Sequence, residues 1–488
     1  MGDRRSFKSD PSFLEKISMG AVGTITVLND LKRQGHLPIE LERGSTSFKI
    51  WKNIKIKRIR VPDVLCLDCG RCVECRTKTK PEISMSHSQA DPERGWDYGL
   101  DDRDRVAFIV CKKKSDEAVA WQSCGPVQYV LTKDLRGSQR ADLAVLTRPK
   151  GAEEGFEMRL IWPSAIARAP GVVAAIKQNR IQYKRQGDNR TISLSLSKQG
   201  KVLTPLVKIG DIVRQNQIVA SVVPASTEFS CDKESGTDKY IRLLSSASLS
   251  DRYKAVKALG FLTSSNVIGF LVGRIEDSGE HVYIRLEAAA GLARQGDNRG
   301  YIFIKERLHD DYLQNRLETV IVLGEIPKNP ASEMLISVLL DKEQHAEIRA
   351  GAAWSIGELR SKVGLDALLE SFGAVEEAIR VEAARALAKL AQRFTPELIH
   401  KFAKAPSEAL PGISWALSKA GKFSIPDMLN LLVKDDARPW VAYIIGNQDQ
   451  RKYVHEIEQL RNKDPEVYFA VTVLWNIMTS WVWGLEEY

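Results

Sequence analysis

The sequence predicts a multidomain chain with an α/β N-terminal region, a small β domain and a C-terminal all-α repeat domain. Three patterns support this division. The second half repeats a helical motif, residues 155–224 alternate short apolar runs with turn residues, and the first 113 residues predict one helix followed by strands. A length of 488 residues suits about three domains. We therefore expect domains at residues 1–150, 151–230 and 231–488.

Composition excludes several classes of protein. Apolar residues make up 43% and charged residues 27%, as in folded proteins in water and unlike disordered, collagen-like or membrane-embedded chains. The net charge is +9, and residues 1–80 alone contain 17 Lys and Arg against 9 Asp and Glu. A basic N-terminal region predicts a polyanionic partner, such as DNA or another nucleic acid.

The cysteines and the N-terminus predict a cytoplasmic protein. The chain starts with a polar stretch, and the apolar residues 17–28 are too few and too amphipathic to span a bilayer. The seven cysteines are odd in number and four lie within ten residues, unlike a secreted disulfide scaffold. We expect reduced or metal-bound thiols and no membrane partner.

The repeat motif places small residues at helical spacing and commonly begins with arginine. Its eight copies begin 28 to 33 residues apart, at Arg252, Arg285, Arg316, Arg349, Arg380, Leu410, Arg438 and Val467. Small residues such as Ala288, Ala352 and Ala383 let neighbouring helices approach closely, and paired helices of this kind stack into a solenoid.

This motif resembles the HEAT-like repeats of the phycobilisome-lyase type, over roughly residues 240–488. The resemblance implies an α-solenoid whose surface binds a protein partner. It does not by itself support lyase chemistry, because a fold does not name its ligand.

The middle segment predicts a small β domain. Residues 205–211 and 217–220 resemble a barrel-sandwich hybrid. More narrowly, residues 170–185 followed by residues 205–220 are similar to a segment of bacterial RNA polymerase β subunits. Gly210 and Asp211 are expected to form a tight turn between two strands. The modified lysine of lipoyl and biotin carriers is missing from the tip, so a spacer or docking role is expected. A nucleic-acid contact through Lys184, Arg185 and Arg190 is the alternative.

The N-terminal region predicts a helix over residues 13–34, stopped by Gly35. Strands are expected within residues 37–44, 47–63, 73–87 and 105–113. An acidic residue, Asp63, is expected to end one strand, and the next strand carries an acid followed by bases.

This order resembles the PD-(D/E)xK restriction-endonuclease-like core, with Pro62-Asp63 as the PD step and Glu74 on the next strand. The resemblance implies that Asp63 and Glu74 bind Mg²⁺, which polarises a scissile phosphate and activates water. Lys78 or Arg76 would orient that water or stabilise developing charge. Glu15 on the first helix is a further candidate carboxylate.

The sequence departs from that family at the lysine. The residue two positions after Glu74 is Arg76, and Lys78 follows two positions later. All three share a face if the segment is a strand, so Lys78 stays available, whereas arginine cannot act as a base. An altered or inactive site therefore remains an alternative.

A basic run precedes Asp63, and no acid lies between Glu42 and Asp63. Its candidate nucleic-acid-binding residues are Lys49, Trp51, Lys52, Lys55, Lys57, Arg58 and Arg60. Cations beside aromatic rings suit phosphate contact and base stacking, while a solvated strand face is the alternative.

The cysteines predict a metal site. Cys66, Cys69, Cys72 and Cys75 follow at three-residue intervals, and Cys-x2-Cys-Gly is typical of a zinc knuckle. We expect structural Zn²⁺ held by Cys66 and Cys69 with Cys111 and Cys124, because a knuckle draws its pairs from separate turns. The alternatives are Cys72 with Cys75 as the second pair, an iron–sulfur cluster, or no metal.

These patterns together predict a nucleic-acid-binding protein with a metal-dependent nuclease-like head and a HEAT-like interaction domain. DNA repair and phage defence would be natural settings. The alternative is a non-catalytic HEAT-repeat scaffold or adaptor whose head binds DNA or protein. A third hypothesis, supported only by the resemblance of the repeats, is a chromophore or cofactor lyase.

Overall fold

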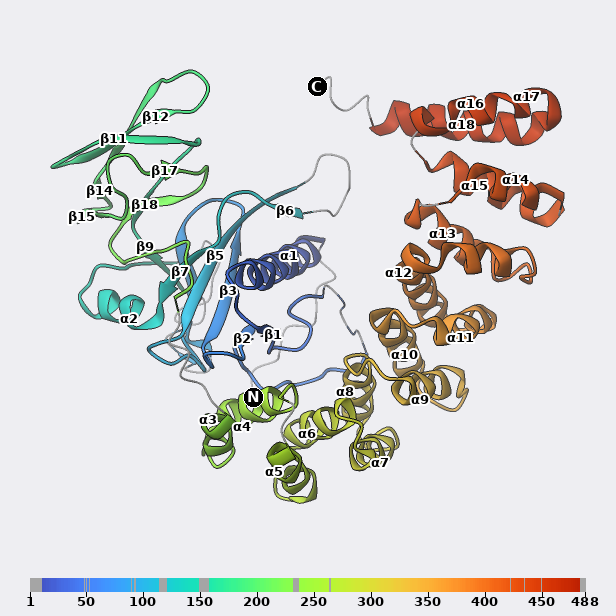
Figure 1. The fold of residues 1–488 in the computed structure, drawn as a ribbon, viewed down its shortest axis with the longest axis horizontal. Coiled ribbons are helices and arrows are strands. Elements are labelled where there is room, and N and C mark those ends of the chain that lie inside the picture. Colours follow the sequence, from blue (N-terminus) through green and yellow to red (C-terminus); the bar gives the residue numbers. More distant parts are fainter. Residues whose placement is uncertain are drawn as a thin grey trace. The chain divides into compact units, whose positions relative to one another are not determined.

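The computed structural model describes residues 11–47, 49, 51, 53–88, 90–91, 94–113, 121–148, 158–230, 237–262, 265–421, 423–433, 435–448 and 450–482. The chain forms two compact units (Figure 1). The first contains Met1–Ile50 and Arg58–Leu259, and the second contains Trp51–Lys57 and Gly260–Tyr488. The expected boundaries at 150 and 230 thus lie inside the first unit. Within the described residues, no helix is long and apolar enough to cross a membrane.

The first unit is built on a mixed sheet. Its strands are β1 (Pro38–Glu40), β2 (Val64–Cys66), β3 (Cys72–Lys78), β5 (Arg105–Lys113), β6 (Trp121–Ser123) and β7 (Gln128–Leu131). The first three strands pair antiparallel, β3 and β5 pair parallel, and β6 and β7 both pair antiparallel with β5. A short helix, α2 (Thr132–Arg140), follows β7.

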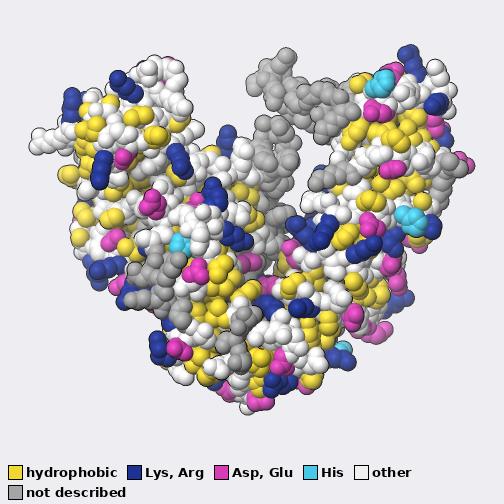
Figure 2. Space-filling model, in the orientation of Figure 1, with side chains coloured by type: hydrophobic (Ala, Val, Ile, Leu, Met, Phe, Trp, Pro, Cys, Tyr) yellow, Lys and Arg dark blue, Asp and Glu magenta, His cyan; other side chains and the backbone are white. Residues whose placement is uncertain are grey.

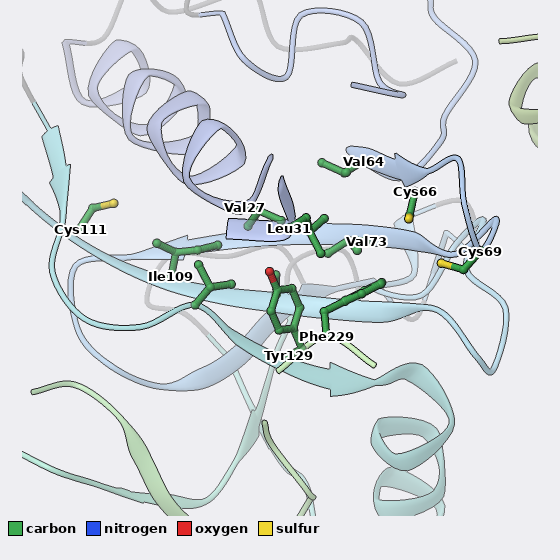
Figure 3. Packing of buried hydrophobic residues seen from close by; sticks show 12 residues of the cluster. Val27, Leu31, Val64, Cys66, Cys69, Val73, Ile109, Cys111, Tyr129 and Phe229 are labelled. Carbon is green, nitrogen blue, oxygen red and sulfur yellow. The ribbon is translucent and has the colours of Figure 1, made fainter. Parts of the chain in front are cut away.

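The predicted N-terminal helix is confirmed as α1 (Pro11–Arg33), which packs on β3 and β5 (Figure 1). It buries Val27 and Leu31 against Val73, Ile109 and other core residues of the sheet (Figure 3). The helix ends before Gly35, whose φ of +82° suits glycine. The strand predicted over residues 47–63 is wrong: none of its described residues is in a strand.

The middle of the chain forms small antiparallel sheets, as the short apolar runs predicted. One sheet joins β4 (Ile83–His87), β9 (Met158–Trp162) and β8 (Val145–Thr147). The others contain β10 (Ser164–Ile166), β11 (Gly171–Lys177), β12 (Arg180–Arg185), β13 (Thr191–Ser195), β14 (Ser197–Lys198), β15 (Lys201–Val202), β16 (Thr204–Pro205), β17 (Ile212–Val213) and β18 (Ile218–Ser221). These strands enclose their own apolar core, and Gly210 has the positive φ, +94°, of a tight turn.

Helices follow to the C-terminal end. The first unit contains α3 (Thr237–Leu243) and α4 (Leu249–Leu259). The second contains α5 (Ser265–Glu276), α6 (Val282–Arg294), α7 (Asn298–Arg307), α8 (Leu313–Leu323), α9 (Asn329–Leu340), α10 (Ala346–Leu359), α11 (Leu365–Glu370), α12 (Glu377–Phe402), α13 (Leu410–Ala420), α14 (Ile425–Leu429), α15 (Arg438–Gly446), α16 (Gln450–Glu458), α17 (Leu460–Lys463) and α18 (Pro465–Val482). Each of the eight predicted repeat segments begins in one of these helices. Ala288, Ala352 and Ala383 are fully buried, which confirms the predicted register.

The arginine that begins most repeats has a structural role. Arg285 donates to the carbonyl of Ile275 at 2.7 Å, and Arg349 donates to that of Leu339 at 3.0 Å. Both carbonyls belong to the last turn of the preceding helix, where backbone acceptors lack helical partners. In these two repeats the arginine therefore ties its helix to the end of the one before it.

The seam between neighbouring helices allows a first test of packing. Replacing the buried Ala383 with leucine should lower the free energy of unfolding by roughly 1–3 kcal/mol, because added methylenes overpack a filled seam. Val375, which is 90% exposed, provides the control substitution Val375→Leu. Chemical denaturation of the two variants measures the difference. Equal stability would contradict the packing described here.

Asp104 fixes the start of both central strands. Its carboxylate accepts the backbone N–H of Cys72 and that of Asp101, each at 2.7 Å. Burial raises the pKa of Asp104 to about 6, and these hydrogen bonds only partly oppose it. The folded state therefore favours the neutral acid more than the unfolded chain does.

This raised pKa predicts how stability depends on pH. The folded-state pKa lies above the unfolded one, so the stabilising contribution is present below about pH 4 and is lost as the pH rises through about 6. In wild type the free energy of unfolding should fall by about 3 kcal/mol across that interval, and Asp104→Asn should remove this fall. Asp311→Asn, at an exposed residue, is the control. Parallel pH profiles for wild type and Asp104→Asn would contradict the assignment.

Candidate functional site

The hairpin of β2 and β3 places two acidic residues side by side. Val64 pairs with Val73, and Leu65 pairs with Cys72, so the register sets Asp63 opposite Glu74. Asp63 is buried, and its Oδ2 accepts the backbone N–H of Cys75 at 2.6 Å. Asp63 precedes β2 rather than ending a strand as predicted. Because β2 and β3 pair antiparallel, the cysteine loop between them reverses the direction of the chain.

A third carboxylate, Glu42, joins this pair. The backbone N–H groups of Leu41 and Glu42 donate to the carbonyl of Asp63 at 2.8 and 3.3 Å, and the two acidic side chains are hydrogen-bonded to each other. Burial, followed by the charge of Glu74, raises the pKa of Glu42 to about 7. The same causes, with Glu42 added, raise the pKa of Asp63 well above its usual value. Sequence reasoning missed Glu42, because no motif marks it.

Basic side chains lie beside these acids on β3. Arg76 Nη2 is 3.0 Å from Glu74 Oε1, and burial lowers the pKa of Lys78 to about 8. Thr77 faces α1, since a Cβ built on Gly23 of that helix would lie 1.8 Å from Thr77 Oγ1. Alternation along the strand therefore places Glu74, Arg76 and Lys78 on the opposite face, as the sequence predicted.

A pocket of about 300 Å³ opens between α1, the turn after β1 and β3. Its charged lining residues are Lys16, Glu42, Asp63, Arg76 and Lys78. Among the described residues, Glu74 does not line the pocket. It affects the pocket indirectly, because it forms an ion pair with Arg76 and its charge repels the carboxylates of Glu42 and Asp63. Because the side chains of Arg76 and Lys78 lie on the face of β3 away from α1, Lys16 is the lining cation that approaches the carboxylates from the helix side. Buried carboxylates with cations nearby suit a phosphate group and a divalent ion.

Glu15 lies elsewhere. Its carboxylate pairs with Lys113 Nζ at 2.6 Å, at the end of β5, and its side chain is 42% exposed. The expected third carboxylate from the first helix is therefore replaced by Glu42 from the turn after β1.

The structure separates the cysteines that the sequence grouped. Cys66 and Cys69 lie at one end of the core, and Cys111 lies at the other (Figure 3). Arg105 pairs with Val73 near the first end, and Cys111 follows six residues later along β5, roughly 20 Å away. Cys124 accompanies Cys111, since its N–H donates to the neighbouring carbonyl of Val110 at 2.8 Å. The expected four-cysteine set is not brought together.

The two remaining cysteines of the cluster lie on β3, where Cys72 is buried and Cys75 is partly buried against the core. Burial raises the pKa of the Cys72 thiol, and the charge of Asp104 adds to the effect. Burial also raises the pKa of the Cys75 thiol, followed by the charge of Asp63. Both thiols therefore favour the protonated form, which is a poor metal ligand.

The central part of the basic run, Trp51–Lys57, is an extended segment that belongs to the second, helical unit, whereas Lys49, Arg58 and Arg60 belong to the first. The N–H groups of Asn53 and Ile54 donate to the carboxylate of Glu347 at 2.9 and 2.6 Å. Ile54 is buried, and Trp51 packs edge-to-face on Trp354 with ring centres 6.2 Å apart. The carboxylate of Glu347, on α10, thus accepts the two backbone N–H groups that would otherwise pair with a neighbouring strand.

The basic side chains of this run make different contacts. Arg58 donates to the carbonyl of Arg43, and Arg60 donates to that of Gly95 at 3.2 Å and lies over the ring of Tyr98. Lys55 and Lys57 are exposed.

Two further residues of the run complete its description. The backbone N–H of Lys49 donates to Ser47 Oγ at 3.1 Å, and Lys52 lies outside the described residues. On the face shown in Figure 2, acidic and basic side chains are interspersed over each unit. The single basic strand expected from the sequence is not formed.

Comparison with known proteins extends these observations. No protein-family model matches the chain, and no curated protein matches it. Among solved structures, the complex of CpcE and CpcF of phycocyanin lyase from Nostoc sp. PCC7120 is 15% identical, with 51% of this chain and 98% of that chain covered and a TM-score of 0.27. An engineered protein is 18% identical, with 43% and 95% covered and a TM-score of 0.23. Human deoxyhypusine hydroxylase in complex with glycerol is 16% identical, with 49% and 94% covered and a TM-score of 0.21.

These likenesses carry no argument about function and do not bear on the nuclease-like or RNA polymerase-like resemblances. The helical repeats of this chain are shown by its own helices and by the arginine contacts that join them.

The contact at Glu347 yields a test. Glu347→Ala should speed tryptic cleavage after Lys55 and Lys57, because the segment loses two charge-assisted hydrogen bonds, worth about 1.5–3 kcal/mol each. Glu347→Gln keeps an acceptor oxygen and should have a smaller effect. Glu343→Ala changes an exposed residue of the same region and is the control. Unchanged cleavage in Glu347→Ala would show that the contact does not hold the segment.

Proposed function

We propose that the first unit is a metal-dependent phosphodiesterase acting on nucleic acid, and that the helical array binds a protein partner. The proposal for the first unit rests on one observation, the position of three acidic residues. Glu42, Asp63 and Glu74 gather at the start of β3, next to Arg76 and Lys78.

The three acids suit a divalent cation. Glu74 raises the pKa of both Glu42 and Asp63, so the carboxylates repel one another at a buried position. A bound cation relieves that repulsion, and carboxylate oxygens are the ligands that Mg²⁺ prefers. Glu42, Asp63 and Glu74 would hold the ion. When bound, it would polarise a phosphodiester and lower the pKa of an attacking water.

The basic residues would bind and orient the substrate. Lys16 lines the pocket from α1, and Arg76 and Lys78 border it from the other face of β3; their charges would attract a phosphate group. Arg76 is held by Glu74 and offers fixed donors, whereas the lowered pKa of Lys78 leaves its proton available near neutral pH. The net positive charge of residues 1–80 would draw a polyanion towards this unit.

A specific observation also supports the adaptor function. Glu347 of the helical array accepts two successive backbone N–H groups of an extended segment, while Trp354 packs against that segment's tryptophan. Backbone recognition of this kind suits binding of extended peptides. The scaffold function is therefore the second candidate, and it requires no chemistry in the first unit.

Cleavage assays separate the two candidates. With Mg²⁺ or Mn²⁺, wild type should cleave single- or double-stranded DNA or RNA, and Asp63→Asn and Glu74→Gln should each abolish cleavage because they remove metal-binding charge. Lys78→Ala should lower kcat more than it weakens binding, since its charge matters most where charge develops. Asp142→Asn, whose side chain is 94% exposed, should leave the rate unchanged.

The outcome that favours the adaptor is equally specific. Wild type that binds nucleic acid or peptide and cleaves none of the four substrates with either metal would overturn the phosphodiesterase proposal. Equal loss in the Asp142→Asn control would show that the assay reports folding rather than catalysis.

A further inference from the structure

A second group of metal-binding side chains lies at the other end of the β2–β3 hairpin. One donor atom each from His36, Cys66 and Asp68 lies within 4.8 Å of the other two. Cys66 Sγ is 3.9 Å from His36 Nδ1, and the side chain of Cys69 is hydrogen-bonded to that of Cys66. Around tetrahedral zinc, a bound sulfur and a bound nitrogen are roughly 3.5 Å apart, so small shifts would suffice.

We propose that His36, Cys66, Asp68 and Cys69 form one structural zinc site. The site differs from the four-cysteine set expected from the sequence, because it takes a histidine from the segment between α1 and β1 and a carboxylate from the turn in place of Cys111 and Cys124. It is independent of the phosphodiesterase proposal and stands whether or not the chain cleaves nucleic acid.

The imidazole is oriented for metal binding. His36 Nε2 lies 2.9 Å from the carbonyl oxygen of Phe229, which can only accept a hydrogen bond. In the neutral ring the hydrogen is therefore on Nε2, and the lone pair of Nδ1 faces Cys66 Sγ. A backbone carbonyl in this position is the usual outer partner of a zinc-bound histidine. Asp68 is oriented in the same way, because its Oδ2 accepts the N–H of Leu37 at 2.9 Å.

The turn directs hydrogen-bond donors at the sulfur of Cys66. Gly70, with φ of +64°, lets the chain turn sharply, and its N–H donates to the carbonyl of Cys66 at 2.8 Å. The side chain of Cys69 and the backbone N–H groups of Cys69 and Asp68 are hydrogen-bonded to the Cys66 sulfur.

A Cys66–Cys69 disulfide is the competing explanation for a Cys-x-x-Cys turn. Both thiols are at most 2% exposed, so exchange with another protein's thiol is hindered. A disulfide also gives no role to His36 and Asp68, which converge on the same sulfur. Zinc accounts for all four side chains.

The site would brace the hairpin that carries the acidic residues. Tyr240 Oη donates to the carbonyl of Leu67 at 3.2 Å, and Lys239 Nζ donates to that of Gly70 at 3.4 Å. The turn is therefore already held by α3, and the metal would add the end of α1 to the same point.

Metal analysis of the full-length protein tests the site. Purified wild type should contain about one zinc per chain. Cys66→Ser and His36→Ala should lose it, whereas Cys111→Ser and Cys124→Ser should retain it. After replacement of zinc by Co²⁺, the visible spectrum should show tetrahedral coordination with sulfur-to-metal charge transfer, and Asp68→Asn should alter it without unfolding the chain.

Three results would overturn the proposal. Wild type that neither contains zinc nor binds added zinc would exclude the site. A Cys66–Cys69 disulfide, seen as the loss of two hydrogen atoms by mass spectrometry, would replace it with a redox pair. Retention of zinc in His36→Ala with loss in Cys111→Ser would favour the four-cysteine set instead. If Cys66→Ser fails to fold, the His36→Ala and Asp68→Asn results decide.

Discussion

The register of the β2–β3 hairpin is the constraint on which both candidate sites depend. Pairing of Leu65 with Cys72 brings Asp63 opposite Glu74 at one end and closes the turn containing Cys66 and Cys69 at the other. A slip of one residue would turn every side chain of one strand to the other face. The acidic pocket and the proposed zinc turn would then be lost together, although their chemistry is unrelated.

The cluster of acidic side chains at one end of this hairpin is electrostatically unfavourable. Burial and mutual repulsion raise the pKa values of Glu42 and Asp63, and the N–H of Cys75 and the guanidinium of Arg76 only partly offset the effect. A sequence selected for stability alone would place apolar residues at these positions. Departures of this kind concentrate at functional sites, which is why the pocket carries the functional proposal.

Local patterns predicted most of the fold and little of the sites. Apolar spacing was sufficient for α1, β5 and the eight repeat helices, because burial of one face acts within each element. The alternating isoleucines of residues 54–59 suggested a strand by the same logic. The partner that decides their structure, Glu347, lies 293 residues away from Ile54 and leaves no local signal. Glu42 and His36 were missed for the same reason, since only tertiary contacts join them to Asp63 and Cys66.

The segment around Asn53 also explains why the chain does not divide into independent domains along its sequence. It leaves the first unit at Ile50 and returns at Arg58. Ser47, four residues before Trp51, lines the acidic pocket, while Trp51 packs on the helical array. A fragment ending at residue 259 would lack Glu347 and leave the N–H groups of Asn53 and Ile54 without this acceptor. The activity of the first unit therefore has to be measured in the whole protein.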